Sequence, residues 1–584
     1  MIDRVKRLLE VGYLPSQLPP CFTTHLLAAD HVNYYKAWLG LQKNPKKGQP
    51  FVPRAAGGKF EVFSVARVGH QRRATGLPNP VTQTYLANHV VAHWGSFLKH
   101  YRRSRLSTSR PRFLHDGARA ANIASMQMLY GQKVARSAGY RYMLRTDISR
   151  FFPTIYTHSV PWAFHTKAVA KVDKDPAGIC FGNLLDLALR QGQDGQTIGI
   201  PIGPDTSHLI AEAIATAIDV ELHSRLGEWP AGFRYVDDYF LFFATEKEAE
   251  EALAALVRAL KQFELQINFE KTFTCSVIEI GDDYWTHQLR NFAIGHGRQR
   301  QTSDINHFFE LAKDLARQNA DESVMVYALK RASSTVIRKE SWDAFEAHLC
   351  HVALAYPNSL QTVARLLSTY VHLAYPVNRS RVARLVNAVI EDHAPLDHHS
   401  EVTWCLWMCK DMDLSLSEAN IDRIADMHSS VCALLLLDLD QAGKLSKALS
   451  GTYWKSFENS AALHGDLWLL SYEAGVRGWA GFSNVHVKKN PHFEVLRKAG
   501  VRFYDPAANL APVFAVKAMA LKTHHVESAA ELFNLDEIDD FDDLVDYEEG
   551  DGGYEGVVMP DIDDSDSSVD AGDELEDLGD YSGG

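Results

Sequence analysis

The 584-residue sequence has few cysteines and no long apolar run. Its seven cysteines include no Cys-x-x-Cys pair, and the nearest neighbours, Cys405 and Cys409, lie one helical turn apart in an apolar segment. This spacing favours free thiols in a reducing compartment over a zinc or disulfide framework. No apolar run approaches the roughly 20 residues that cross a bilayer, and the N-terminus lacks the apolar core of an export signal. We therefore expect a cytoplasmic protein with no membrane partner.

Lysine and arginine are absent from residues 531–584, which hold 22 of the 73 acidic residues. The net charge of −13 therefore comes from this segment, because the first 530 residues carry all 60 Lys and Arg against 51 Asp and Glu. A positive body suits a protein that handles a polyanion such as RNA or DNA. Residues 511–584 are predicted to be a linker and a disordered acidic tail. Such a tail either solubilises the protein or mimics nucleic acid in a basic channel.

A basic stripe lies in the N-terminal region, residues 1–139. Its cations are interleaved with Tyr101 and Phe113 and comprise Lys99, Arg102, Arg103, Arg105, Arg110, Arg112 and Arg119. Such a stripe can neutralise phosphates while its aromatic rings stack on bases. The alternative is a solvated helix face.

The middle and the C-terminal parts differ in their hydrophobic period. Residues 140–280 predict a mixed α/β unit with a short strand at 140–148, a long helix at 207–226 and a hairpin around Asp237 and Asp238. Residues 281–510 have apolar residues at helical spacing in successive blocks, which predicts an all-helical, solenoid-like domain. The fold class is therefore α+β.

Three carboxylates have the placement that phosphoryl transfer requires. Asp147 ends a short apolar strand, and Asp237 and Asp238 occupy the turn of the hairpin. Transfer from a nucleoside triphosphate uses two divalent ions held by carboxylates from separate strands. Each feature alone is weak, since an acidic turn is usually solvated and an Asp after a strand is usually a helix cap.

The order of the motifs strengthens this hypothesis. The segments concerned are 73–78 (Arg-Ala-Thr-Gly-Leu-Pro), 147–153 (Asp-Ile-Ser-Arg-Phe-Phe-Pro), 199–204 (Gly-Ile-Pro-Ile-Gly-Pro), 207–212 (Ser-His-Leu-Ile-Ala-Glu), 235–238 (Tyr-Val-Asp-Asp) and 268–272 (Asn-Phe-Glu-Lys-Thr). In this order they resemble the successive motifs of reverse transcriptases. The resemblance implies a right-hand polymerase, with fingers in residues 1–139, a palm at 140–280 with a fingers insertion at about 153–198, and a thumb-like and helical-repeat domain at 281–510.

The same resemblance assigns roles to the acidic residues and to one aromatic. Asp147 and Asp237 would hold two Mg²⁺ or Mn²⁺ ions, and Asp238 would complete the cluster, since hard oxygen ligands suit these ions. Phe152 matches the position that excludes a 2′ hydroxyl, which implies deoxynucleotide substrates. The alternative is that Phe152 is plain core beside Phe151.

Further assignments concern the substrate phosphates and the template. Arg73, or its neighbour Arg72, would grip the triphosphate, and Lys271 would protonate or neutralise the departing pyrophosphate unless it is an ordinary exposed lysine. Gly199, Pro201, Gly203, Ser207 and Tyr235 would position the template or the incoming base. Ser207 is also predicted to cap the helix that follows.

A palm followed by a long helical domain resembles the bacterial abortive-infection and defence-associated reverse transcriptases. This resemblance implies a bacterial cytoplasmic enzyme of antiphage defence, and it leaves the template and primer open, because some members attach DNA to a protein tyrosine. Tyrosines of the acidic tail that such priming could use are Tyr547, Tyr554 and Tyr581. A non-coding RNA and a homo-oligomer are the expected partners besides dNTPs.

Alternatives from other classes stay open. One is a retron-like RNA-templated enzyme, although the Val-Thr-Gly signature of that family is absent. Another is a catalytically silent scaffold that binds nucleic acid, and a third is a nucleotidyltransferase that needs no template. In the helical region, His398-His399 is predicted to be a surface pair and Cys405 and Cys409 core thiols, not a metal site.

Overall fold

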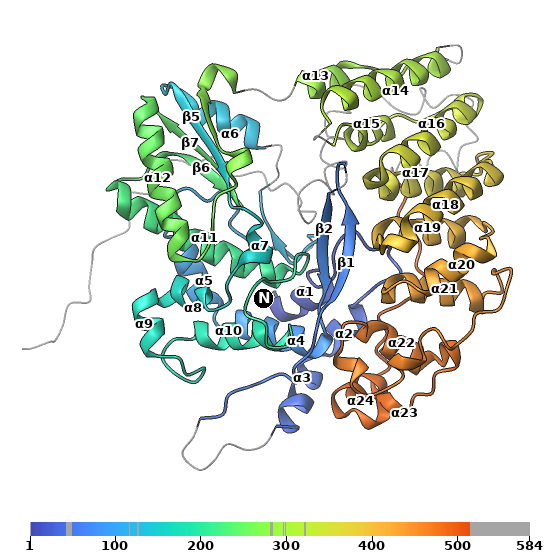
Figure 1. The fold of residues 1–584 in the computed structure, drawn as a ribbon, viewed down its shortest axis with the longest axis horizontal. Helices are drawn as coiled ribbons and strands as arrows, with labels where there is room; N and C mark the ends of the chain where they lie inside the picture. Colours follow the sequence, from blue (N-terminus) through green and yellow to red (C-terminus); the bar gives the residue numbers. More distant parts are fainter. Residues whose placement is uncertain are drawn as a thin grey trace, which may run out of the picture.

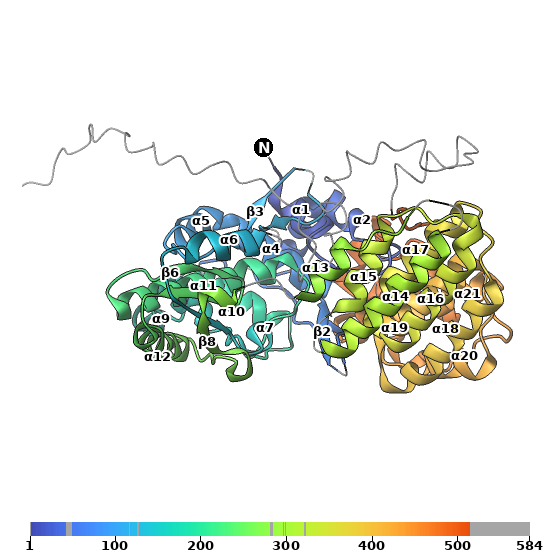
Figure 2. The ribbon, with the colours of Figure 1, turned by 90° about the horizontal axis from the view of Figure 1, so that it is seen from above.

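The computed structural model describes residues 2–42, 50–69, 71–115, 117–124, 128–280, 284–295, 297, 300–320 and 323–513. Most of the predicted acidic tail, with Tyr547, Tyr554 and Tyr581, lies outside the described residues. Two lobes stand side by side with a β hairpin between them (Figures 1 and 2). Within the described ranges, no helix combines the length and apolarity needed to cross a membrane.

A four-stranded antiparallel sheet forms the centre of the first lobe, in the order β6-β7-β5-β8. The strands are β5 (Tyr142–Asp147), β6 (Ala231–Tyr235), β7 (Asp238–Phe243) and β8 (Phe273–Ser276). Side chains alternate between the two faces of the sheet along each strand. Other elements cover both of these faces. Leu144 and Leu241 join the core beneath α11 (Asp205–Leu226) and α12 (Glu246–Gln262). Met143 and Phe240 join a second cluster with Leu129 of α6 (Met128–Ser137).

Local sequence explains the ends of the two long helices. Thr245 and Glu248 form a reciprocal capping box that starts α12, and Gly227 ends α11 in the left-handed conformation at φ 82°. The predicted strand, hairpin and long helix are all present. The predicted cap at Ser207 is wrong, because α11 begins at Asp205 and Ser207 is buried inside its first turn.

The remaining elements of the first lobe are mostly short helices. They are α1 (Arg4–Glu10), α2 (His25–Ala29), α3 (His31–Gly40), α4 (Pro80–Ala92), α5 (Trp94–Tyr101), β3 (Arg112–Phe113), β4 (Ala121–Asn122), α7 (Phe151–Thr154), α8 (Ser159–His165), α9 (Lys167–Val172), α10 (Gly182–Gln191), and the 3-10 turns η1 (Phe269–Lys271) and η2 (Val277–Glu279). The hairpin between the lobes pairs β1 (Glu61–Ala66) with β2 (Arg72–Leu77).

The second lobe is an arc of helices that runs from α13 to α24 (Figure 1). Its α-helices are α13 (Tyr284–Asn291), α14 (Gln301–Gln318), α15 (Val324–Ser333), α16 (Trp342–Ala355), α17 (Leu360–His372), α18 (Arg379–His393), α19 (His399–Met412), α20 (Glu418–Ala425), α21 (Ser430–Gln441), α22 (Trp468–Arg477), α23 (Val485–Lys489) and α24 (Pro491–Lys498). Its 3-10 turns are η3 (Lys339–Ser341), η4 (Pro357–Ser359), η5 (Ala394–Leu396), η6 (Lys455–Phe457), η7 (Ala462–His464) and η8 (Trp479–Gly481). Helices two apart in sequence contact each other from α14 to α20. The result is a stack of helix pairs.

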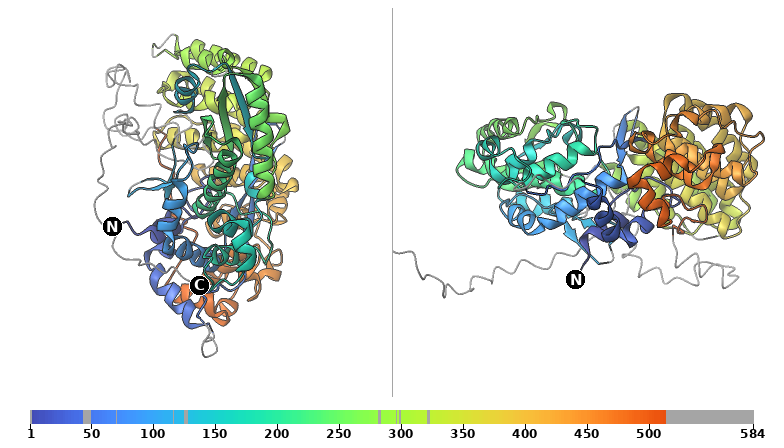
Figure 3. Two further views of the ribbon diagram at one scale, coloured as in Figure 1. Left: turned by 90° about the vertical axis from the view of Figure 1, so that its left-hand side faces the viewer. Right: turned by 90° about the horizontal axis from the view of Figure 1, so that it is seen from below.

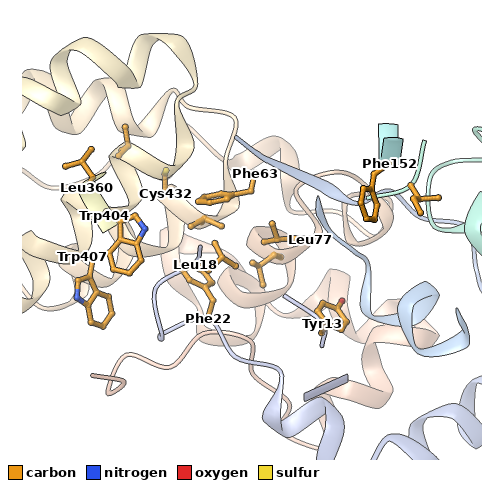
Figure 4. Close-up of a cluster of buried hydrophobic side chains, with 14 of the residues drawn as sticks. Tyr13, Leu18, Phe22, Phe63, Leu77, Phe152, Leu360, Trp404, Trp407 and Cys432 are labelled. Carbon is orange, nitrogen blue, oxygen red and sulfur yellow. The ribbon is translucent and has the colours of Figure 1, made fainter. Parts of the chain in front are cut away.

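The two lobes share one hydrophobic core. Leu18 and Phe22 from the N-terminal segment, Phe63 from β1 and Trp404 from α19 lie in the same buried cluster (Figure 4). The N-terminal elements, drawn in blue, lie between the green and the orange parts of the molecule (Figure 3, right). The helical arc is therefore packed against the rest of the protein rather than tethered to it.

Backbone hydrogen bonds tie the N-terminal segment to the end of the helical arc. The amide of Thr23 donates to the carbonyl of Phe503 at 2.9 Å, and the amide of Asp505 donates to the carbonyl of Cys21 at 2.7 Å. The indole of Trp468 also donates to the carbonyl of Leu77, at the end of β2, at 3.1 Å. The N-terminal segment and the end of β2 are therefore hydrogen-bonded to the last part of the helical lobe.

Candidate active site

Two neighbouring strands bring the three predicted carboxylates together. Asp147, the last residue of β5, lies directly opposite Asp238, the first residue of β7. The amide of Ile148 donates to the carbonyl of Asp237 at 3.1 Å, which fixes the hairpin turn beside the end of β5. Residues opposite each other in an antiparallel pair have Cβ atoms about 4.5–5.5 Å apart. The carboxylates thus converge at one edge of the sheet.

Their mutual repulsion shows in their acidity. Burial, and then the charges of Asp238 and Asp147, raise the pKa of Asp237 to about 7. Burial and the charge of Asp147 also raise the pKa of Asp238. A divalent cation bound between the three carboxylates would remove this repulsion.

The donor set fits a hard divalent ion. Asp147 Oδ1 is buried and has no hydrogen-bond partner among the residues that the structure describes. An orphaned carboxylate oxygen beside two further carboxylates is the ligand set that Mg²⁺ or Mn²⁺ prefers. The arrangement of the described residues therefore fits the predicted metals.

Lys271 lies at the same edge of the sheet. Its Nζ is 3.1 Å from Asp147 Oδ2, and its side chain is 63% exposed. The turn η1 is held in place because the amide of Asn268 donates to the carbonyl of Asp147 at 2.9 Å and the hydroxyls of Thr272 and Thr146 are 2.7 Å apart. An exposed ammonium group thus stands beside the carboxylates.

The turn that presents Asp237 is strained. Val236 has a φ of 54°, a left-handed conformation that a β-branched residue rarely adopts. Such a residue costs on the order of 1–3 kcal/mol and persists only where its surroundings hold it. The amide of Val236 donates to Ser109 Oγ at 2.9 Å, and its carbonyl accepts from Arg234 Nη1 at 2.7 Å.

A buried ionic network supports this turn from below. The guanidinium of Arg234 is fully buried and pairs with Glu212 and Asp219 of α11, each at 2.9 Å. Ser107 donates to Glu212 at 2.6 Å, and Tyr239 donates to Asp219 at 2.8 Å. Sequence reasoning missed the network. The available signal was one arginine inside an apolar strand and two acids seven residues apart on one face of an apolar helix.

Phe152 lies in α7, close to α11. Its ring packs edge-on against Phe151 and His208, and its side chain is buried. The amide of Ile200 donates to the carbonyl of Phe152 at 3.0 Å. This hydrogen bond joins α7 to residues 199–204, the segment predicted to position the template. Both roles expected for Phe152 are compatible with this position.

Residues 199–204, which were predicted to position the template, are joined to the β1–β2 hairpin. The amide of Gly76 donates to the carbonyl of Ile202 at 2.8 Å, and a Cβ on Gly76 would stand 2.5 Å from Pro201 Cβ. Gly199 and Gly203 have φ values of 84° and 116°, so both need glycine. The Arg-x-x-Gly and Gly-x-Pro motifs, whose residues Gly76 and Gly199 are 123 positions apart, therefore lie against each other.

The other two residues assigned to the template are buried. The hydroxyl oxygen of Ser207 has no hydrogen-bond partner among the described residues. Tyr235 ends β6 opposite Asp238, and burial together with the charge of Asp238 raises the pKa of its phenol. Neither side chain lies on the surface.

Arg72 and Arg73, the two arginines predicted to bind the triphosphate, lie in different surroundings. Arg72 forms an ion pair with Glu401 of α19 and donates to Ser64 Oγ at 2.9 Å, so its guanidinium faces the helical lobe. Arg73 is half-buried and lies opposite Val65 in the hairpin. Arg67, which the sequence prediction omitted, lies just beyond β1. Burial lowers its pKa while the negative charge of Asp237 acts in the opposite direction, which places Arg67 near the carboxylates.

The predicted basic stripe divides into exposed and structural residues. Tyr101 and Phe113 are not free to stack on bases, because Tyr101 is buried and donates to the carbonyl of Leu209 at 2.7 Å, and Phe113 packs on Trp94. Arg119 is buried in an ion pair with Asp205 at 2.6 Å. The stripe residues that remain exposed are Lys99, Arg102, Arg103, Arg105 and Arg112.

The prediction for the helical lobe was partly wrong. Cys405 and Cys409 are free and buried, as predicted. His399 is not a surface residue, because its Nδ1 accepts a hydrogen bond from the amide of Ser64 in β1 at 3.2 Å. A contact between residues 335 positions apart leaves no local signal in the sequence.

Residues 82–308 match the family described as Reverse transcriptase (RNA-dependent DNA polymerase). A reverse transcriptase domain is therefore present, and it contains the three carboxylates and Lys271. Its enzyme class is that of an RNA-directed DNA polymerase. No curated protein matches the chain in sequence.

Among solved structures, the chain is similar to apo telomerase from Candida tropicalis, with 10% identity over 74% of this chain and 76% of that chain and a TM-score of 0.29. It is also similar to telomerase from Candida albicans in complex with the TWJ fragment of telomeric RNA, with 9% identity, 75% and 68% coverage and a TM-score of 0.25. With TM-scores this low, neither similarity says anything about the function of this chain.

Proposed function

We propose that the chain adds deoxynucleotides to a DNA strand on an RNA template, by two-metal phosphoryl transfer at Asp147, Asp237 and Asp238. The observation that supports this proposal is the convergence of the three carboxylates at the ends of β5 and β7. When bound, Mg²⁺ or Mn²⁺ would make the 3′ hydroxyl a better nucleophile and stabilise the leaving pyrophosphate. Asp147 and Asp237 would hold both ions, with Asp238 contributing charge.

The surrounding residues would act on the nucleotide. Lys271, 3.1 Å from Asp147, can deliver a proton to the leaving pyrophosphate or balance its charge. Arg73 and Arg67 are assigned to the triphosphate, since a guanidinium matches phosphate geometry. Arg72 is left out of this role because Glu401 holds it. Phe152 would close the space below the sugar and so select deoxynucleotides.

The experiment that tests the activity compares wild type with an Asp237→Asn/Asp238→Asn variant. Both proteins are purified with whatever nucleic acid accompanies them and given labelled dNTPs with Mg²⁺. We expect DNA from wild type only, and DNA synthesis by both proteins would sink the assignment of the carboxylates. Asp194→Asn, which removes an exposed carboxylate paired with Lys59 at 3.5 Å, serves as the matched control.

The same reaction addresses the template, the primer and the partners. Sequencing the product identifies the template, and the accompanying RNA shows whether a non-coding RNA is bound. Protease treatment shifts the product on a gel only if DNA is attached to protein. Mass photometry of the same sample tests the proposed homo-oligomer.

We also propose a role in bacterial antiphage defence. It rests on the resemblance of a palm followed by a helical domain to the abortive-infection group. Cells that express wild type should give fewer phage plaques than cells that express the Asp237→Asn/Asp238→Asn variant at equal protein level. Equal plaque counts across a broad phage panel would contradict this role and leave the polymerase assignment untouched.

A further inference from the structure

Two histidines and a glutamate lie close together behind the β1–β2 hairpin. His393 ends α18, His398 directly precedes α19, and Glu401 lies in the first turn of α19. The tight turn of η5 brings the histidines together, and the amide of His398 donates to the carbonyl of His393 at 3.2 Å. The two Nδ1 atoms are 2.7 Å apart. Glu401 Oε1 lies 3.5 Å from Nδ1 of His393 and 3.7 Å from Nδ1 of His398.

Glu401 Oε1 is the oxygen nearer the two rings, and it also accepts a hydrogen bond from Arg72 Nη1. Glu401 Oε2 accepts from Ser400 Oγ at 2.7 Å and from Arg72 Nη2 at 2.9 Å. Metal-binding carboxylates are commonly oriented by such hydrogen bonds. The Glu401 side chain is fully buried, whereas those of His393 and His398 are 19% and 24% exposed. The cluster is therefore rigid on the protein side and reachable from solvent.

We propose that His393, His398 and Glu401 bind one transition-metal ion of the zinc type, with water in the fourth position. Two imidazole nitrogens and one carboxylate oxygen suit Zn²⁺ and disfavour Mg²⁺. Bonds of about 2.0–2.1 Å in a tetrahedral site hold two nitrogens roughly 3.3 Å apart, so the rings separate slightly on binding. Before metal binds, one of the two rings donates the hydrogen bond between the Nδ1 atoms. On binding, this ring changes to the Nε2–H tautomer, so both imidazoles bind as neutral ligands.

The ion would lie directly behind the hairpin. Glu401 pairs with Arg72 of β2, and Ser400 Oγ accepts from the amide of Ala66 at 3.0 Å. Through these contacts a bound ion would stabilise the hairpin that carries Arg67 and Arg73. This consequence rests on the proposed function, whereas the metal site does not.

The test is a titration of the full-length protein, first treated with a chelator. Co²⁺ is added as a probe, because tetrahedral Co²⁺ absorbs visible light, and Zn²⁺ binding is followed by calorimetry. We expect one ion per chain, unaffected by millimolar Mg²⁺. A His393→Ala/His398→Ala variant should lose at least 100-fold in affinity, and Ser400→Ala about 10-fold. A His393→Gln/His398→Gln variant repeats the test with the side-chain volume better preserved.

Two controls separate this site from others. His428→Ala removes a histidine that pairs with Asp466 at 3.2 Å on the surface and should leave binding unchanged. Asp237→Asn/Asp238→Asn should also bind Zn²⁺ normally, so the metal site can stand even if the polymerase proposal fails. The proposal is overturned if wild type gives no saturable Co²⁺ absorption, or if a folded double-histidine variant binds as tightly as wild type.

Discussion

Arg234 Nη1 donates a hydrogen bond to the carbonyl oxygen of Val236 across 2.7 Å. The guanidinium that makes this contact is buried between Glu212 and Asp219. A charge inside the fold therefore holds the strained turn that presents Asp237. The stability of the lobe and the geometry of the sheet edge that carries the three carboxylates depend on the same side chain.

Replacing Arg234 by methionine should destabilise the protein strongly. The change leaves the carboxylates of Glu212 and Asp219 buried without their cation, and removing one partner of a buried pair costs about 3–5 kcal/mol. Urea unfolding followed by circular dichroism measures the loss. Arg225→Met, which breaks a partly exposed pair with Glu221 at 2.7 Å, is the matched control and should cost less than about 1 kcal/mol. Equal effects of the two variants would contradict the supporting role of Arg234.

Replacing Lys271 by methionine should slow nucleotide addition with little effect on folding. If Lys271 delivers a proton to pyrophosphate, kcat falls by roughly 10²-fold or more, while the thermal midpoint stays close to that of wild type because the side chain is largely exposed. Single-turnover kinetics measures the chemical step. Lys247→Met removes an exposed lysine near Glu251 and should leave kcat unchanged. A Lys271→Met rate within twofold of wild type would remove this residue from the mechanism.

Replacing Phe152 by valine should admit ribonucleotides. The smaller side chain opens space below the sugar, so the ratio of kcat/KM for dATP over ATP should fall at least ~10-fold. The ratio cancels any general loss of active protein that results from the missing contact with His208. Phe151→Val tests the neighbouring ring. If both variants keep the wild-type ratio, Phe152 is a core residue only.

The acidity of Asp237 predicts how pH and Mg²⁺ affect stability. Its pKa is raised from 3.8 to about 7, so between these values the folded state holds a proton that the unfolded chain has released. The stability that this group contributes is therefore present below about pH 4 and is lost as pH rises to about 7. Mg²⁺ should raise the thermal midpoint more at pH 8 than at pH 5. Scanning fluorimetry of wild type and Asp237→Asn at both pH values measures the thermal midpoints. The prediction is refuted if Mg²⁺ shifts the midpoints of the two proteins equally.

The sequence predicted those parts of the site that are encoded locally. The apolar runs on either side of the acidic pair indicated the hairpin, and the pair between them indicated Asp237 and Asp238. Tyr101 was misassigned because an aromatic beside cations has the same local pattern whether it packs inside or stacks on a base. Its hydroxyl is bonded to the backbone of Leu209, 108 residues away.

Contacts between distant segments could not be predicted. Arg72 and Glu401 are 329 positions apart, and a single sequence offers no reason to pair them. The network of Arg234 needs three charges to meet inside an apolar environment, and the sequence showed only that charges occur there. His393 was overlooked because the turn of η5, not a helical period, brings it to His398.

The pairing of residues 21–23 with residues 503–505 also bears on how the protein is made. A growing chain that has left the ribosome with its first 300 residues already contains every predicted catalytic residue. At that stage Thr23 lacks Phe503, Leu77 lacks Trp468 and Arg72 lacks Glu401. The β1–β2 hairpin thus receives these two contacts only after Glu401 and Trp468 have been made. Truncated products should accordingly carry the carboxylates but not the finished enzyme.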